Sequence, residues 1–277
     1  MPRMIISLLM FFMPFITHAE SPQHTLVFSG VVLEQGNNAL AERFTKWLSV
    51  QVNYPLLTQY AESYQSLSDS LREHPESLGW TCGIPFIQDY NSDGQQLVAV
   101  PLFHGKPTYH SLVVTRVGRQ EKTLADFEGK VFAYSDARSN SGFIAPSYAL
   151  KQQEIKIQSY FRYLMHTGLH EYSLEALLAG QADVANIDEY VLVEYFKAHP
   201  EAKAKLVVLE KFGPFPFTPI VAGKQVSGKI IQRLQQALLG MSEDPEGIKI
   251  LKHLGLDGFV LKPPSFYQPL VDMLNAL

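Results

Sequence analysis

The sequence predicts an α/β protein of two lobes with a ligand cleft between them, and three observations support this. The chain has 277 residues, of which 46% are hydrophobic and 18% charged, so it can form one large or two ordinary folded domains. Strand-like and helix-like segments alternate from residue 24 to residue 87, and the alternation restarts after residue 115. Such alternation favours parallel sheets with helices on their faces.

The N-terminus has the pattern of a secretory signal peptide, residues 1–19. Arg3 precedes an apolar run, residues 4–16, and Ala19 provides a small residue at the cleavage point. The run is shorter than the ~20 residues that a membrane-spanning helix needs; an uncleaved anchor is the alternative. We therefore expect a periplasmic protein, free of the membrane and monomeric. Its single cysteine, Cys82, rules out an internal disulfide.

Charge and histidine spacing exclude other classes of partner. The formal net charge is −4 and the Lys and Arg residues form no cluster, so we expect no nucleic-acid partner. The nine histidines include no HExxH pattern or paired metal spacing, so we expect neither a metal nor another cofactor.

The first lobe is predicted from an opening strand–helix–strand–helix–strand pattern. The strands are expected at residues 24–32, 54–60 and 78–87, and the helices at residues 37–52 and 63–77. Two further strands are expected at residues 95–103 and 109–116.

The second lobe is predicted where the pattern restarts. Its elements are a short helix at 123–130, strands at 131–135, 184–188 and 204–210, and helices at 173–183 and 189–200. A Pro/Gly-rich segment, residues 213–219, breaks the chain before a short strand and two closing helices. We therefore assign residues 20–114 plus 211–277 to lobe 1 and residues 115–210 to lobe 2. Clefts between lobes are favoured sites for small ligands.

A polar turn between a strand and a helix, "SDARSNSGF" at residues 135–143, is the strongest candidate site. Free backbone N–H groups and the dipole at a helix start favour an anion. Ser139 and Ser141 can add hydroxyl donors, and Gly142 permits close approach of the backbone. The pattern is neither a nucleotide P-loop nor a nucleophile elbow. An ordinary helix cap is the alternative.

The same turn resembles a family signature. "YSDARSNSGFIAPSYAL" (residues 134–150) is similar to the Asp-x-x-Ser-x-Ser-Gly-aromatic-x-x-Pro motif of periplasmic phosphonate-binding proteins, which belong to the phosphate/phosphite/phosphonate substrate-binding family of ABC importers. "GLHEYSLEALLAGQADVANIDEYVL" (residues 168–192) resembles the second signature of that family. The stretches "ESYQSL", "GWTCG" and "TYHSLVV" upstream are weaker matches.

The resemblance implies a fold and a set of site residues. The fold is the type II periplasmic binding protein, a two-lobed venus flytrap with the ligand in the cleft. Matching positions imply that the oxyanion is held by Ser139, Asn140 and Ser141. His170 matches a pocket histidine, and Tyr64 and Tyr109 match aromatic wall residues; core packing is the alternative for both tyrosines.

Asp188 stands near the acidic acceptor of the family, and Glu189 is a rival for that role. A carboxylate can accept a hydrogen bond from a phosphonate or phosphate that keeps a proton. Sulfate has none to give, and an unpaired buried acceptor would disfavour it by roughly 10⁴-fold or more. Asp188 could instead pair with a ligand ammonium group, or only cap the following helix.

The expected function is capture of a small phosphorus oxyanion, a phosphonate, phosphite or phosphate, for delivery to an ABC transporter permease. Delivery to a sensor protein is an alternative partner, and a sulfonate or a thiamine-precursor pyrimidine an alternative ligand. Ser141, His170 and Asp188 could form a hydrolase triad, but no elbow motif frames the serine. We therefore expect a binding protein and not an enzyme.

Overall fold

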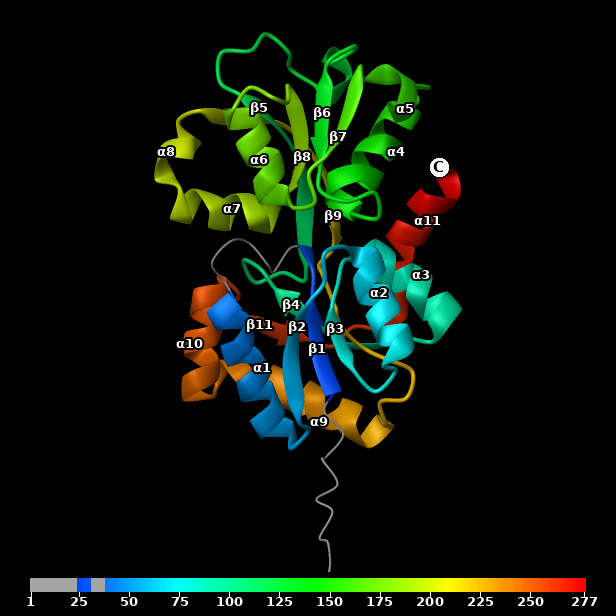
Figure 1. Cartoon of the computed structure of the whole chain (residues 1–277), viewed down its shortest axis with the longest axis vertical. Coiled ribbons are helices and arrows are strands. Elements are labelled where there is room, and N and C mark those ends of the chain that lie inside the picture. Colours follow the sequence, from blue (N-terminus) through cyan, green and yellow to red (C-terminus); the bar gives the residue numbers. More distant parts are fainter. Residues whose placement is uncertain (1–23, 31–37) are drawn as a thin grey trace, which may run out of the picture.

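The computed structural model describes residues 24–30 and 38–277, which form two stacked α/β lobes (Figure 1). The predicted signal peptide, residues 1–19, lies outside the described residues. In the part of the chain that the structure describes, no helix has both the length and the apolar character needed to cross a bilayer.

Lobe 1 is built on a six-stranded sheet in the order β11-β4-β10-β3-β1-β2. Its elements are β1 (His24–Phe28), α1 (Asn38–Val52), β2 (Leu56–Tyr60), α2 (Tyr64–Glu73), β3 (Leu78–Trp80), α3 (Gly83–Asp93), β4 (Gln96–Leu102), β10 (Ile220–Ala222), α9 (Gly228–Leu239), α10 (Pro245–Leu254), β11 (Gly258–Val260) and α11 (Gln268–Ala276). Helices α1, α9 and α10 pack together on one side, and α2 and α3 on the other (Figure 1).

Lobe 2 is built on a five-stranded sheet in the order β7-β6-β8-β5-β9. Its elements are β5 (Thr108–Arg116), β6 (Val131–Tyr134), α4 (Ala145–Lys151), α5 (Ile157–Tyr160), β7 (Tyr163–His166), α6 (His170–Leu178), β8 (Val184–Asp188), α7 (Glu189–Ala198), α8 (Pro200–Lys203) and β9 (Leu206–Pro216). Together the two sheets and their helices confirm the predicted two-lobed α/β class.

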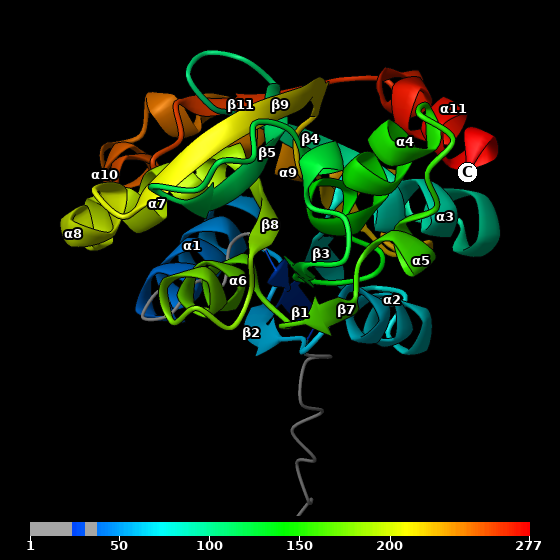
Figure 2. The same ribbon diagram turned by 90° about the horizontal axis from the view of Figure 1, so that it is seen from above.

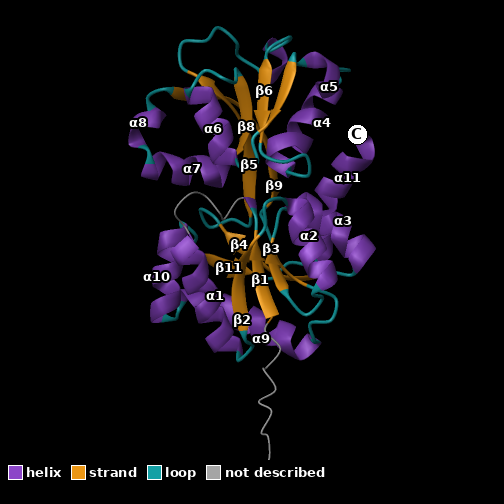
Figure 3. Ribbon diagram, viewed as in Figure 1, coloured by secondary structure: helices purple, strands orange, loops and turns teal. Residues whose placement is uncertain are grey.

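The chain crosses between the lobes twice. The first crossing lies between β4 and β5 and the second between β9 and β10, because β5 and β9 pair along their lengths within the second sheet (Figure 3). The boundaries expected at residues 114 and 211 therefore fall inside these two strands. At the end of the chain, α11 of lobe 1 packs against both α3 and α4, so it touches both lobes (Figure 2).

Parallel pairing places the polar turns of each lobe at one edge of its sheet. β1 pairs in parallel with β2 and β3, so Phe28 lies opposite Tyr60 on one side and Trp80 on the other. β6 pairs in parallel with β7 and β8 in the second lobe. The carboxyl edges of such sheets are where ligands of α/β proteins bind.

Several elements differ from the sequence expectation. The predicted opening pattern of three parallel strands is confirmed, but residues 78–87 are not one strand and turn, since α3 starts at Gly83. β9 also continues to Pro216 and runs through most of the segment expected to break the chain. Five elements of the structure have no counterpart in the sequence expectation: α5, β7, α8, β11 and α11.

Trp80 lies in the core of lobe 1. Its side chain is 1% exposed and packs with Phe28, Phe44 and Phe259, with ring centroids 5.2–6.1 Å away. Its indole Nε1 donates to Thr218 Oγ1 over 3.4 Å. Trp80 is therefore a core residue at the end of β3, and it fixes the position of Thr81 and Cys82 that follow.

Candidate functional site

The polar turn after β6 forms a tight, buried loop, which we name the serine loop, residues 135–142. Ser139 is the cap of a short π-helical turn, Asn140–Ile144, and its Oγ accepts a hydrogen bond from the Gly142 N–H at 3.0 Å. That bond uses one lone pair of Ser139 and leaves its hydroxyl proton available for another acceptor. Ser139 can therefore cap this turn, which was the alternative role expected from the sequence, and still donate its hydroxyl proton to a ligand.

Gly142 is required by close contacts within the loop. A Cβ at this position would lie 2.6 Å from Ser135 Oγ, 3.1 Å from Ser139 Oγ and 3.3 Å from His170 Cε1. Two serine hydroxyls and an imidazole therefore converge on the face of the loop where only a glycine fits.

His170, the first residue of α6, faces the serine loop. Its Nε2 lies 3.3 Å from Ser141 Oγ and 3.4 Å from Ser135 Oγ, and the residue is 1% exposed. Burial lowers the pKa of His170 to about 4, and the nearby Asn186 backbone offsets this only in part. The imidazole is therefore neutral near pH 7.

Asp188 ends β8 and has two different carboxyl oxygens. Oδ1 accepts from the Tyr190 N–H at 2.9 Å and caps α7, while Oδ2 accepts no hydrogen bond from the described residues. Burial raises the pKa of Asp188 to about 8, because the backbone N–H groups of Tyr190 and Val191 and the nearby Ser141 hydroxyl compensate only in part. The carboxyl is therefore mostly protonated near pH 7.

Glu189, the rival of Asp188, points away from the serine loop. Its Oε2 lies 2.6 Å from His110 Nδ1, and its Oε1 lies 3.4 Å from Lys211 Nζ. These contacts join α7 to β5 and β9 at the junction of the lobes. Of the two acids, Asp188 is the one whose carboxyl group lies near Ser141 of the buried serine loop.

The two predicted wall tyrosines are both buried beside the serine loop. Tyr109 is 1% exposed, and its hydroxyl accepts from Asn140 Nδ2 at 2.9 Å. Tyr64 is 3% exposed and packs against Gly30, where a Cβ would lie 2.4 Å from the tyrosine hydroxyl. Burial raises the pKa of both phenols well above its usual value. The side-chain amide nitrogen of Asn140 is thus engaged by Tyr109 in this structure.

Tyr109→Phe is expected to lower the free energy of unfolding by about 1–3 kcal/mol, since the buried Asn140 amide would lose its acceptor. Chemical denaturation of Tyr109→Phe and of the unmodified protein would measure this loss. Phe103→Leu, which changes the buried volume at another core position, serves as the reference variant. Equal stability of Tyr109→Phe and the unmodified protein would contradict the role given to this hydroxyl.

Lobe 1 adds polar groups that the sequence did not single out. Ser29 follows β1 and Thr81 follows β3, and both are at most 2% exposed. Cys82 Sγ accepts from the Asn140 N–H at 3.5 Å, which joins the end of β3 to the serine loop across the lobes. Their position at the carboxyl ends of parallel strands was the available signal.

Unpartnered polar atoms from both lobes are the main electrostatic feature of this region. Within the described residues, buried atoms without a hydrogen bond include Ser29 Oγ, Thr81 Oγ1, Asn140 Oδ1 and Asp188 Oδ2. An unpartnered buried polar atom costs about 1–3 kcal/mol. Buried polar atoms without a partner in a native structure call for an explanation, such as a functional role or a bound water or ion.

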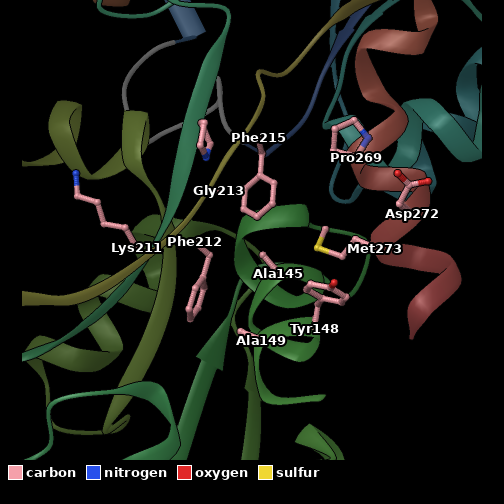
Figure 4. A pocket seen from close by; sticks show the side chains of 11 residues that line it. Ala145, Tyr148, Ala149, Lys211, Phe212, Gly213, Phe215, Pro269, Asp272 and Met273 are labelled. Carbon is pink, nitrogen blue, oxygen red and sulfur yellow. The ribbon is translucent and has the colours of Figure 1, made fainter. Parts of the chain in front are cut away.

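Several cavities lie between residues of different lobes. One of about 400 Å³ is lined by Tyr60, Glu62, Leu169 and Tyr172 among others, next in sequence to Tyr64 and His170. A larger one of about 600 Å³ lies between α4, β9 and α11, where Tyr148, Phe215 and Met273 surround it (Figure 4). The serine loop lines neither of these two cavities, and its distinguishing feature is its buried polar groups.

Comparisons with known proteins agree in both sequence and structure. A family model described as "ABC transporter, phosphonate, periplasmic substrate-binding protein" matches residues 28–265. The phosphonates-binding periplasmic protein of Escherichia coli (strain K12) is 24% identical over 250 residues, which cover 86% of this chain and 72% of that protein.

Two solved structures share the fold. The binding-protein component of an ABC phosphonate transporter from Pseudomonas aeruginosa has a TM-score of 0.83 and 20% identity, covering 92% of this chain and 86% of that one. PhnD1 from Prochlorococcus marinus, solved in complex with methylphosphonate, has a TM-score of 0.80 and 16% identity, covering 92% and 99% of the two chains. At these identities the likeness concerns the fold.

Proposed function

This chain belongs to the family of periplasmic substrate-binding proteins of phosphonate ABC transporters, and from that premise we propose that its serine loop, His170 and Asp188 bind the oxyanion head of a phosphonate, phosphite or phosphate. The observation that carries the proposal is the convergence of buried polar groups from both lobes. Ser29 and Thr81 of lobe 1 and Asp188 of lobe 2 each keep an oxygen without a partner.

The chemistry of these groups suits a tetrahedral oxyanion. Ser139 and Ser141 donate hydroxyl protons, and His170 Nε2 gains a proton as the anion stabilises its charged form. Tyr64 and Tyr109 close the sides, and Asn140 holds Tyr109 with its amide nitrogen. Binding at the carboxyl edges of both sheets draws the two lobes together, as in hinge closure around a ligand.

Asp188 and the ligand share one proton in this proposal. Either the protonated carboxyl donates to a phosphonate oxygen, or its carboxylate accepts from a phosphonate O–H. Because the pKa of Asp188 is raised to about 8, the carboxyl can supply the proton itself near pH 7. Sulfate, which is the weaker base, would then bind less tightly than a phosphonate. The difference in affinity would be smaller than the one expected if Asp188 could only accept a hydrogen bond.

No bond is broken in this function. Ser141 lies near His170, but neither carboxyl oxygen of Asp188 bonds the imidazole, and one of them caps α7. A Ser-His-Asp triad needs that carboxylate–imidazole bond to orient the base. We propose instead that the protein works after removal of residues 1–19, in the periplasm, and hands its ligand to a permease or a sensor protein.

Thermal unfolding of residues 20–277 with a panel of ligands tests the proposal. A ligand present at 100 times its Kd adds about 2.7 kcal/mol and raises Tm by roughly 5–10 °C. We expect such shifts with methylphosphonate, phosphite or phosphate and smaller ones with sulfate. A shift with taurine alone would point to a sulfonate, and a shift with 2-aminoethylphosphonate alone to an ammonium contact at Asp188.

A further inference from the structure

The side chain of Arg138 in the serine loop reaches into the other lobe. Arg138, which immediately precedes Ser139, belongs to lobe 2, yet its guanidinium makes its hydrogen bonds with helices α2 and α3 of lobe 1. Nη2 donates to Asp89 Oδ1 at 2.9 Å, and Nη1 donates to Ser68 Oγ at 2.8 Å. Nε donates to Gln88 Oε1 at 3.0 Å, and Nη1 also reaches Gln65 Oε1 at 3.2 Å.

The ion pair in this cluster is largely removed from solvent. The side chain of Asp89 is 5% exposed and that of Arg138 is 19% exposed. A pair at such depth is screened far less by salt than a surface pair. Asp89 Oδ2 is bonded separately by Ser68 and Gln95, so the Oδ1 atom is the one reserved for Arg138.

A second residue of the loop makes the same crossing. Asp136 Oδ2 accepts from the backbone N–H of Tyr64, the first residue of α2, at 3.2 Å. Its other oxygen accepts from the N–H of Arg138 at 2.7 Å. A carboxylate at a helix N-terminus is favoured by the helix dipole. The start of the serine loop is therefore held against lobe 1 at two points.

We propose that Arg138, through Asp89, is a positioning residue that latches the serine loop onto lobe 1 and so sets ligand affinity by favouring the closed arrangement of the lobes. The latch bonds the protein and not the ligand, so it strengthens every ligand that the closed site accepts by the same factor. Apparent affinity scales with the fraction of molecules in the binding-competent state. The affinity part of this inference rests on the proposed function; the closure part does not.

Arg138→Ala is expected to raise the Kd for methylphosphonate about 10–100-fold, mainly through faster dissociation, with an association rate within about 3-fold of the unmodified protein. The order of affinities among methylphosphonate, phosphate and sulfate should stay the same. Arg138→Lys, which keeps one charged contact, should recover part of the loss. Asp89→Asn should reproduce the effect without leaving a buried carboxylate unpaired.

Arg72→Ala is the matched control. Arg72 also bonds two aspartates on α2 and α3, Asp69 and Asp93, but both of them belong to its own lobe. It should leave the Kd within about 2-fold of the unmodified protein. A Kd for Arg138→Ala no higher than that of Arg72→Ala, or a changed order of ligands, would overturn the latch.

Small-angle X-ray scattering of the ligand-free variants separates this inference from the proposed function. If the latch favours closure, Arg138→Ala and Asp89→Asn have a larger radius of gyration than the unmodified protein and Arg72→Ala. This holds even if no phosphorus oxyanion binds. Identical radii of gyration in all four proteins would contradict the latch, whatever the ligand proves to be.

Discussion

Replacing Ser139 and Ser141 together with alanine is expected to weaken methylphosphonate binding by ~10²–10³-fold. Each hydroxyl would donate to a charged oxygen in a site from which water is excluded, and hydrogen bonds to charged groups contribute about 1.5–3 kcal/mol each. Both residues are at most 1% exposed, so no solvent replaces the lost donors. Isothermal titration of the double variant against the unmodified protein would measure the change.

Ser147→Ala is the matched control for this pair. Ser147 lies on α4 just beyond the serine loop, is 6% exposed, and donates its hydroxyl to the Phe143 carbonyl at 2.6 Å. We expect it to change affinity by less than about 3-fold, because the bond it loses is a local one to the backbone four residues earlier. If the control weakened binding as much as the double variant, the effect would be one of loop stability and the hydroxyls would not be ligand donors.

Asp188→Asn is expected to make the ligand-free protein more stable near neutral pH. The folded pKa of about 8 lies above the ordinary value of 3.8, so the folded protein holds the proton more tightly than the unfolded chain. The contribution of this proton to the free energy of unfolding is then fully present below about pH 4, and it is lost as the pH rises towards 8. Asparagine avoids this loss while still capping α7, and we expect a gain of about 2–4 kcal/mol at pH 7.

The pH dependence of the two proteins checks this account. The stability difference should be near zero at pH 4 and largest at pH 8, as measured by urea unfolding across that range. A variant less stable than the unmodified protein at pH 7 would contradict the raised pKa. An increase in stability with a loss of native binding behaviour is the usual signature of a residue kept for function.

The same substitution should change how binding depends on pH. In the unmodified protein, affinity for methylphosphonate should fall about tenfold per pH unit above pH 8, because Asp188 and the ligand would then both be charged. Asp188→Asn should remove this slope. Binding of 2-aminoethylphosphonate that persists above pH 8 and is lost in Asp188→Asn would instead identify Asp188 as the partner of an ammonium group.

Most of the fold could be predicted because each lobe repeats a strand and an amphipathic helix. The misses have physical causes at particular residues. Gly83 and Pro85 resemble a turn, but the first turn of a helix tolerates proline because its N–H has no partner there, and α3 begins there. β9 contains Pro214 and Pro216 and still forms a strand, because it lies at the edge of its sheet where proline is tolerated.

The lobe 2 residues of the proposed site could be named from the sequence, and the lobe 1 residues largely could not. The serine loop, His170 and Asp188 occur within conspicuous local motifs, and the structure brings them together. Thr81 and the partners of Arg138 lie about 50–70 residues away from the loop in sequence. Their roles depend on how two separate sheets face each other, which no local pattern encodes. The hydrogen bond from the Asn140 amide nitrogen to Tyr109 is a further contact that the sequence did not predict, and the oxyanion role of Asn140 stays a prediction.

The most direct test of the central claim is isothermal titration of residues 20–277 with methylphosphonate at pH 7, beside Ser141→Ala and Ser147→Ala. The proposed site predicts one ligand per chain, a Kd raised about 10–100-fold in Ser141→Ala, and little change in Ser147→Ala. Absence of binding by methylphosphonate, phosphite and phosphate alike, or equal affinity in Ser141→Ala and the unmodified protein, would contradict an oxyanion site at the serine loop.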